Sequence, residues 1–99
     1  MTMSKSIELG PLLTIAESMA LQEIFETKLR TAQEIEIDAS AVTAADTAGM
    51  QLLLAFCQEA VSRGIEVTWL QTGTAIPRAA ELLGLRQALE LPKQQEAQQ

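Results

Sequence analysis

The chain has 99 residues, 47% of them hydrophobic and 20% charged, which is enough for one hydrophobic core and too little for a second domain. Its formal net charge of −6 repels phosphate groups, so nucleic acid is not an expected partner. The sequence contains no histidine and no glycine-rich phosphate loop, so we expect a protein that is not an enzyme and that has no cofactor or metal site.

Two further features concern the cellular compartment. The single cysteine, Cys57, has no partner for an internal disulfide and lies in an apolar helical stretch, where a buried, reduced thiol is expected. The first residues lack the apolar region of a signal peptide, and no apolar run approaches the roughly 20 residues of a membrane span. These features predict a cytoplasmic protein without membrane insertion.

The N-terminal part of the chain reads as two short strands. Residues 7–9 alternate as a half-exposed strand does, Gly10-Pro11 indicates a turn, and residues 12–15 form a more apolar stretch. Because so few residues separate the two strands, a parallel crossover is excluded and an antiparallel hairpin is expected.

A helix and a third strand follow. Residues 19–30 carry apolar side chains at the spacing of one helix face, with Ser18 as the expected N-cap. The apolar positions of this face are Leu21, Ile24, Phe25 and Leu29. Residues 34–38 then alternate strictly, so Ile35 and Ile37 should share the buried face of a strand.

The most clearly bounded element is the helix that starts at Asp46-Thr47-Ala48-Gly49 and ends at Arg63-Gly64. Asp46 is the expected N-cap, since a short acid accepts hydrogen bonds from the free N–H groups of a first helical turn. The apolar stripe expected to be buried comprises Met50, Leu53, Leu54, Cys57 and Val61. Leu52 and Phe56 lie off this stripe and either pack against a neighbouring helix, which we favour, or face a partner.

The C-terminal part supplies the remaining elements. Residues 65–70 are expected to form a fourth strand, and a helix containing Ile76 and Leu83 should end at Gly84. Leu89 and Leu91 extend either a short final strand or a helix over the core. The resulting order, β-β-α-β-α-β-α, indicates one α/β domain over residues 1–92, followed by a disordered Gln-rich tail over residues 93–99.

Several segments occur in an order typical of one known family: residues 35–38, the loop with Ser40 and Val42, the Asp46-Thr47-Ala48-Gly49 turn, the Leu-rich helix, Trp69-Leu70, and Leu82-Leu83-Gly84-Leu85. Together they resemble the STAS domain family, which includes the bacterial anti-sigma factor antagonists. The resemblance covers about residues 7–91, and its most specific part is the Asp-Thr-Ala-Gly turn. It implies an α/β fold in which helices pack on a mixed sheet of four to five strands, and a role in binding instead of catalysis.

The resemblance also implies site residues. In the antagonists the hydroxyl residue directly after the Asp is phosphorylated by a partner serine kinase, and only the unphosphorylated form binds that partner. Thr47 occupies this position and is the expected phosphoacceptor. The residues expected to bind a partner are Ser40, Asp46, Thr47, Ala48, Gly49 and Met50.

Two functions therefore stay open at this point. One is a phosphorylation-regulated switch in bacterial partner-switching or chemosensory signalling, bound to an anti-sigma factor or serine kinase. The alternative follows from a similar Asp-Thr-Ala-Gly sequence in the STAS subunit of the phospholipid-transport ABC system, where the domain binds the ATPase without needing phosphorylation. Either way we expect a protein partner, no nucleic acid, and a monomer or weak homodimer.

Overall fold

The structure, a computed structural model, describes residues 6–91 of the chain. Its elements in chain order are β1 (Ser6–Glu8), β2 (Leu12–Leu13), the 3-10 helix η1 (Ile15–Glu17), α1 (Ser18–Thr31), β3 (Glu34–Asp38), β4 (Ala44–Ala45), α2 (Thr47–Ser62), β5 (Glu66–Gln71) and α3 (Ala75–Leu83). The predicted tail over residues 93–99 lies outside the described residues, as do the first five residues of the predicted domain.

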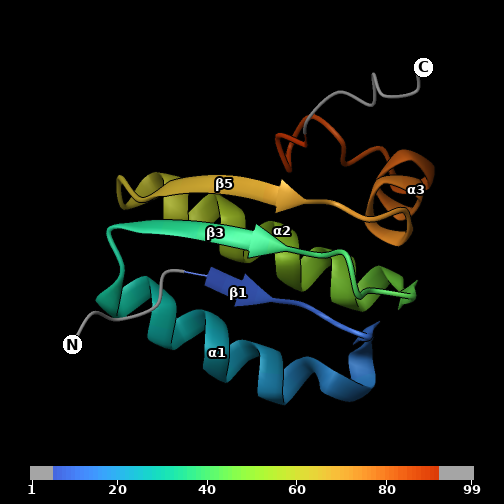
Figure 1. The fold of residues 1–99 in the computed structure, drawn as a ribbon, viewed down its shortest axis with the longest axis horizontal. Helices are drawn as coiled ribbons and strands as arrows, with labels where there is room; N and C mark the ends of the chain where they lie inside the picture. Colours follow the sequence, from blue (N-terminus) through green and yellow to red (C-terminus); the bar gives the residue numbers. More distant parts are fainter. Residues whose placement is uncertain (1–5, 92–99) are drawn as a thin grey trace.

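The main sheet contains three strands in the order β1-β3-β5, and both of its pairings are parallel. Helices α1 and α2 pack side by side on one face of this sheet, while α3 lies beyond the carboxyl ends of the strands (Figure 1). Ile35 and Ile37 of β3 point to the covered face and are fully buried, as their alternation predicts. The expected α/β fold, with helices packed on a sheet, is confirmed, although the sheet has fewer strands than the expected four to five.

The predicted hairpin between the first two strands is wrong. β1 pairs in parallel with β3, and β2 pairs in parallel with β4, a short strand inside the predicted loop. The reason is that β1 stays beside β3 to its end, where the Leu9 N–H donates to the Asp38 carbonyl at 2.9 Å. The chain then continues in the same direction, and the Thr43 N–H donates to the Pro11 carbonyl at 2.8 Å. The segment that contains β1 and β2 therefore runs parallel to the segment that contains β3 and β4. No antiparallel pair occurs within residues 6–91.

Helix α1 matches its predicted range to within one residue at each end, but its cap differs. Leu21 and Phe25 are buried, whereas Ile24 is 45% exposed. Ser18 is the first helical residue and not the N-cap; Glu17 holds that position without a side-chain capping bond. The cap shifts because η1 leads directly into α1, so the Ser18 N–H already bonds the Ile15 carbonyl.

Helix α2 buries a stripe turned slightly from the predicted one. Phe56 is buried and its ring stacks on the ring of Phe25 in α1, with centroids 4.2 Å apart. Val61, expected to be buried, is 55% exposed, and Leu54 is only half-buried. The interpretation of Phe56 as a packing residue is confirmed, because α2 contacts α1 as well as the sheet and must bury two sides.

The C-terminal segment after α3 packs on the sheet edge as turns, not as a further strand or helix. Leu89 is buried, and its carbonyl accepts a hydrogen bond from the Trp69 indole Nε1 at 3.2 Å. This bond attaches the segment to β5, whose outer edge has no strand partner among the described residues.

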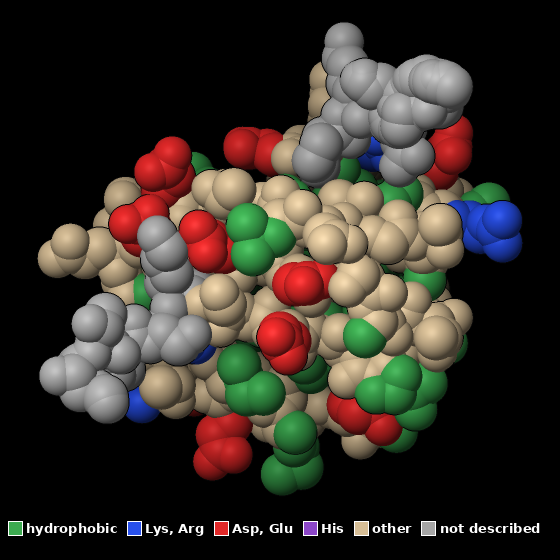
Figure 2. Space-filling view, in the orientation of Figure 1, with side chains coloured by type: hydrophobic (Ala, Val, Ile, Leu, Met, Phe, Trp, Pro, Cys, Tyr) green, Lys and Arg blue, Asp and Glu red, His purple; other side chains and the backbone are tan. Residues whose placement is uncertain are grey.

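The opposite face of the main sheet is not covered by a described helix (Figure 1), and it is acidic. Figure 2 shows this face, with acidic side chains spread over the strands. The strand alternation places on it Glu8, Glu34, Glu36, Asp38 and Glu66. Much of the negative charge of the chain is therefore displayed on one side, away from the helices.

Candidate functional site

The Asp46-Thr47-Ala48-Gly49 turn lies at the carboxyl ends of the strands, where β4 leads into α2 and where α3 also begins. The loops that follow parallel strands all lie at the carboxyl end of the sheet, so polar and apolar side chains from several loops come together there. The site is built from these loops and from the first turn of α2.

Asp46 holds the start of α2 with both oxygens of its carboxylate. Oδ1 accepts a hydrogen bond from the Gly49 N–H at 2.8 Å, and Oδ2 accepts one from the Ile15 N–H at 3.0 Å. These bonds, that of Gly49 first, lower the pKa of the carboxyl below its ordinary value. The predicted N-cap is confirmed, and the same side chain also connects α2 to η1.

Gly49 is required by a close approach of two backbones. A Cβ atom added at this position would lie 2.0 Å from the carbonyl oxygen of Leu13, far inside van der Waals contact. The approach is fixed by the neighbouring Asp46 N–H, which donates to that same carbonyl at 3.1 Å. The glycine of the turn thus allows β2 to lie against the first turn of α2.

Thr47 is exposed, in contrast to the residues around it. Within residues 6–91 its hydroxyl has no hydrogen-bond partner, so nothing in the described fold uses it. Ala48 is half-buried, whereas Gly49 and Met50 are buried, with Met50 fully inaccessible. Thr47 is therefore the accessible residue of the turn, whereas Gly49 and Met50 face the interior.

Ser40, the remaining predicted site residue, is exposed but is engaged in a different turn. Its N–H and its hydroxyl both donate to Oδ1 of Asp38, at 2.9 and 2.7 Å, and these bonds lower the pKa of that carboxyl. No hydrogen bond described in residues 6–91 connects Ser40 with Asp46 or Thr47. The structure brings Ser40 to the same edge of the sheet without joining it to the turn.

Apolar side chains beside the turn were not anticipated from the sequence. Ile15, whose N–H donates a hydrogen bond to Asp46, is 65% exposed. The predicted strand over residues 12–15 placed Ile15 on the same side as the buried Leu13, but the 3-10 turn rotates it outward. The strand predicted over residues 12–15 is therefore too long: β2 ends at Leu13, and nothing in this apolar stretch marks the 3-10 turn that begins at Ile15.

On the other side of the turn a shallow cavity of about 250 Å³ separates β4 from α3. Leu82, which is 82% exposed, lies at this cavity with Ala44, Ala45 and Arg78. Thr47 thus follows Asp46, which bonds the Ile15 N–H, and lies two residues after Ala45, which lines this cavity. We call the exposed residues Ile15, Thr47, Arg78 and Leu82 the Thr47 surface.

A comparison with protein families gives a match over nearly the whole chain. The family model described as "Mlab, STAS domain" matches residues 4–92. The chain belongs to the STAS domain family. No curated protein matches it closely enough to count as a relative. The matched range of this STAS domain includes every described element from β1 to α3, and with them the turn at Asp46.

The described part of this STAS domain offers little other reactive chemistry. Residues 6–91 contain no group of three or more His, Cys, Asp or Glu side chains placed to hold a metal ion. None of the helices in that range has the combined length and apolar content needed to cross a bilayer. Burial, and secondarily the charge of Glu90, raise the pKa of the Cys57 thiol to about 12, which makes it a poor nucleophile.

Proposed function

We propose that this STAS domain is a non-catalytic accessory subunit that binds the ATPase of a phospholipid-transport type ABC transporter through the Thr47 surface. The observation that carries the proposal is the exposed hydroxyl of Thr47, which has no partner within residues 6–91 although the turn around it is held by several hydrogen bonds. A rigid turn that leaves one polar group free is suited to recognition by another protein.

The turn is pre-organised for binding. Asp46 and Gly49 fix the backbone on both sides of Thr47, so little conformational freedom is lost when a partner docks. The exposed side chains of Ile15 and Leu82 supply apolar area near the turn that carries the Thr47 hydroxyl. An apolar area with a few polar groups resembles the composition of stable protein interfaces.

Two arguments favour constitutive binding to an ATPase. The matching family model is described by the name Mlab and not as an anti-sigma factor antagonist. The Asp-Thr-Ala-Gly turn is also similar to that of the STAS subunit of the phospholipid-transport ABC system.

The second candidate is the phosphorylation-regulated switch of bacterial partner-switching or chemosensory signalling. The exposure of the Thr47 hydroxyl at a helix start favours it, since a kinase can reach this group. A phosphate would bring about −1.5 to −2 charges to the Thr47 surface and would separate it from a partner shaped for a neutral hydroxyl. In this case the partner is an anti-sigma factor or serine kinase.

Purification from native cells separates the two candidates. Recovery with an ABC ATPase, together with an intact mass that shows no phosphate, is the expected result. Recovery with a histidine-kinase-like serine kinase, with a phosphate mapped to Thr47, would overturn the accessory-subunit proposal in favour of the phosphorylation-regulated switch.

Substitution of Thr47 tests the surface itself. Thr47→Glu should abolish binding of the recovered partner and leave the far-UV circular dichroism unchanged, because the side chain is exposed. Thr27→Glu is the matched control: it adds the same charge at an exposed threonine of α1 that lies outside the Thr47 surface. Equal binding by both variants would show that the interface lies elsewhere.

A further inference from the structure

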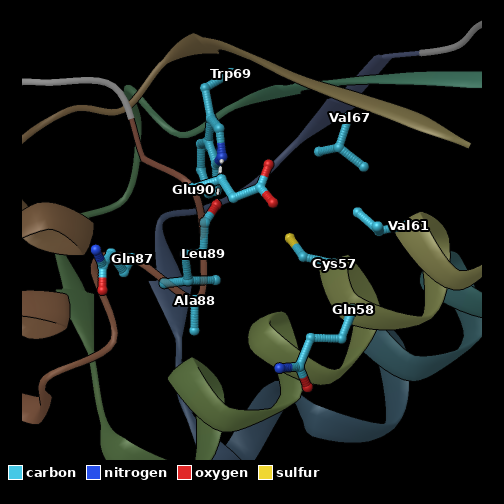
Figure 3. Close-up of a pocket in the computed structure, with 9 residues that line it drawn as sticks. All are labelled: Cys57, Gln58, Val61, Val67, Trp69, Gln87, Ala88, Leu89 and Glu90. Carbon is cyan, nitrogen blue, oxygen red and sulfur yellow. Dashed lines mark hydrogen bonds between the residues drawn. The ribbon is translucent and has the colours of Figure 1, made fainter.

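A cavity of about 330 Å³ lies near the C-terminal end of α2, between that helix, β5 and the segment after α3. Its apolar wall is formed by Cys57, Val61, Val67 and Leu89, and the Trp69 indole forms another side (Figure 3). The volume falls at the lower end of the roughly 300–1,000 Å³ typical of small-molecule sites. The cavity is therefore large enough for a small organic ligand.

One charged group faces this cavity. The carboxylate of Glu90 points into the space between Trp69, Val67 and Cys57 (Figure 3). After burial, the negative charge of Glu90 is the second cause of the raised pKa of the Cys57 thiol. No Lys or Arg is among the described residues that line the cavity.

The wall that carries Glu90 is held in place by hydrogen bonds. The Trp69 Nε1–H donates to the Leu89 carbonyl at 3.2 Å, and the Glu90 N–H donates to the Gln87 carbonyl at 3.0 Å. Glu90 also has a φ of 55°, in the left-handed region that a glutamate rarely adopts. The backbone thus presents the carboxylate beside the indole.

We propose that this cavity binds a small organic cation, an alkylammonium whose chain lies along Cys57, Val61 and Val67 and whose charged head lies between the Glu90 carboxylate and the Trp69 ring. An apolar wall takes up the chain, and a carboxylate and an aromatic face are the two groups that attract an ammonium ion. The same carboxylate repels an anionic ligand of the same length.

This site is separate from the proposed docking surface. Cys57 follows Thr47 by ten residues along α2, which corresponds to about 15 Å at 1.5 Å per residue. Ligand binding at the cavity therefore does not depend on Thr47, and its failure would leave the proposed function unaffected.

Trp69 is the only tryptophan of the chain and reports on the cavity directly. The full chain is titrated with hexylammonium chloride while the indole fluorescence is followed. We expect a saturable change and an affinity at least about fivefold higher than for hexanol, which has the same chain without the charge. Hexanoate should not bind. Equal affinities for the three compounds, or no saturable change with hexylammonium, would overturn the proposal.

Variants locate the binding. Glu90→Gln should weaken hexylammonium binding by about fivefold or more, and Val61→Phe should weaken it by filling the cavity from an exposed position. Glu81→Gln, which removes an exposed carboxylate of α3 outside the cavity, is the control and should bind as the unmodified chain does. Unchanged binding by both Glu90→Gln and Val61→Phe would place the ligand elsewhere and overturn the proposal.

The other occupant to be tested is the chain itself, through Lys93, which lies outside the described residues. Lys93→Gln should bind hexylammonium with unchanged affinity. An affinity about tenfold higher in this variant would mean that Lys93 competes for the cavity, and the proposed free ligand would then be wrong.

Discussion

The two ends of helix α2 are built in opposite ways. At its N-terminal end the Gly49 backbone lies against the Leu13 carbonyl, and the Asp46 carboxylate accepts two backbone hydrogen bonds. At its C-terminal end the chain turns at Gly64, where a Cβ atom would meet nothing within 4 Å, and a cavity of about 330 Å³ lies nearby.

This difference separates two kinds of binding region. At the N-terminal end two backbones are in close contact, and the turn they fix leaves the Thr47 hydroxyl exposed, as the proposed docking requires. The C-terminal end leaves space that a small ligand can enter. A single helix thus connects the proposed docking turn with a cavity, and substitutions at its two ends should have different consequences.

The largest effect is expected for Gly49→Ala. A Cβ atom 2.0 Å from the Leu13 carbonyl oxygen must force β2 and α2 apart, and we expect a loss of about 3 kcal/mol in the free energy of unfolding. Urea denaturation followed by far-UV circular dichroism measures it. Gly64→Ala is the control at the other end, where the φ of 77° alone should cost about 1 kcal/mol. Equal losses in the two variants would contradict the comparison.

A smaller effect is expected from the Asp46 carboxylate, and it depends on pH. Its pKa is lower in the folded than in the unfolded chain, so it stabilises the fold above the unfolded pKa, and this contribution is lost as the pH falls through the folded pKa. Below about pH 4 the unmodified chain should therefore lose stability faster than Asp46→Asn, which cannot titrate.

Thermal denaturation of both proteins between pH 2 and pH 7 tests this. Asp38 has a lowered pKa as well but is present in both proteins, so the difference between the two curves isolates Asp46. Parallel curves would show that the hydrogen bonds from Gly49 and Ile15 do not act on the ionised form.

The exposed ion pair at the C-terminal end of α2 should contribute less still. The Arg63 Nε lies 2.8 Å from a Glu59 carboxylate oxygen, and both side chains are about half exposed. A double-mutant cycle with Glu59→Ala and Arg63→Ala should give a coupling of about 0.4 kcal/mol that decreases in high salt. A coupling above about 1 kcal/mol would show that this end is more rigid than its geometry indicates.

The smallest effect on stability is expected for Thr47→Ala. Because the hydroxyl has no hydrogen-bond partner within residues 6–91, its removal should change the free energy of unfolding by less than about 0.5 kcal/mol. The same variant should weaken partner binding. Thr47 would then affect binding without affecting stability, whereas Asp46 and Gly49 affect stability. A large loss of stability would mean that Thr47 supports the turn.

Features set by neighbouring residues were predicted well. The Asp46 cap acts over three residues, to the Gly49 N–H, and the start and end of α2 follow from Asp46 and Gly64. Strand β3 was likewise evident from its alternation, since one of its faces is buried and the other is at least partly exposed. Such patterns are local, because they depend on hydrogen bonds and side-chain periods within one element.

Pairing between distant segments was not predictable in the same way. A short connection between residues 9 and 12 allows a hairpin, but the alternative partners of these strands lie some thirty residues further along the chain. The same holds for Ile15, whose N–H donates to Asp46, 31 residues further along the chain, and whose side chain is exposed. The sequence contains no local signal for either contact.

By itself, the sequence determined that this protein is a single α/β chain of the STAS type with an acid, a hydroxyl and a glycine at the start of its central helix. Only the tertiary structure decided why each of the three is there. Asp46 accepts a hydrogen bond from η1, Gly49 lies in close backbone contact with β2, and Thr47 is accessible. The reason is physical: a helix start is encoded by its own few residues, whereas the space around it is created by strands that meet it from elsewhere in the chain.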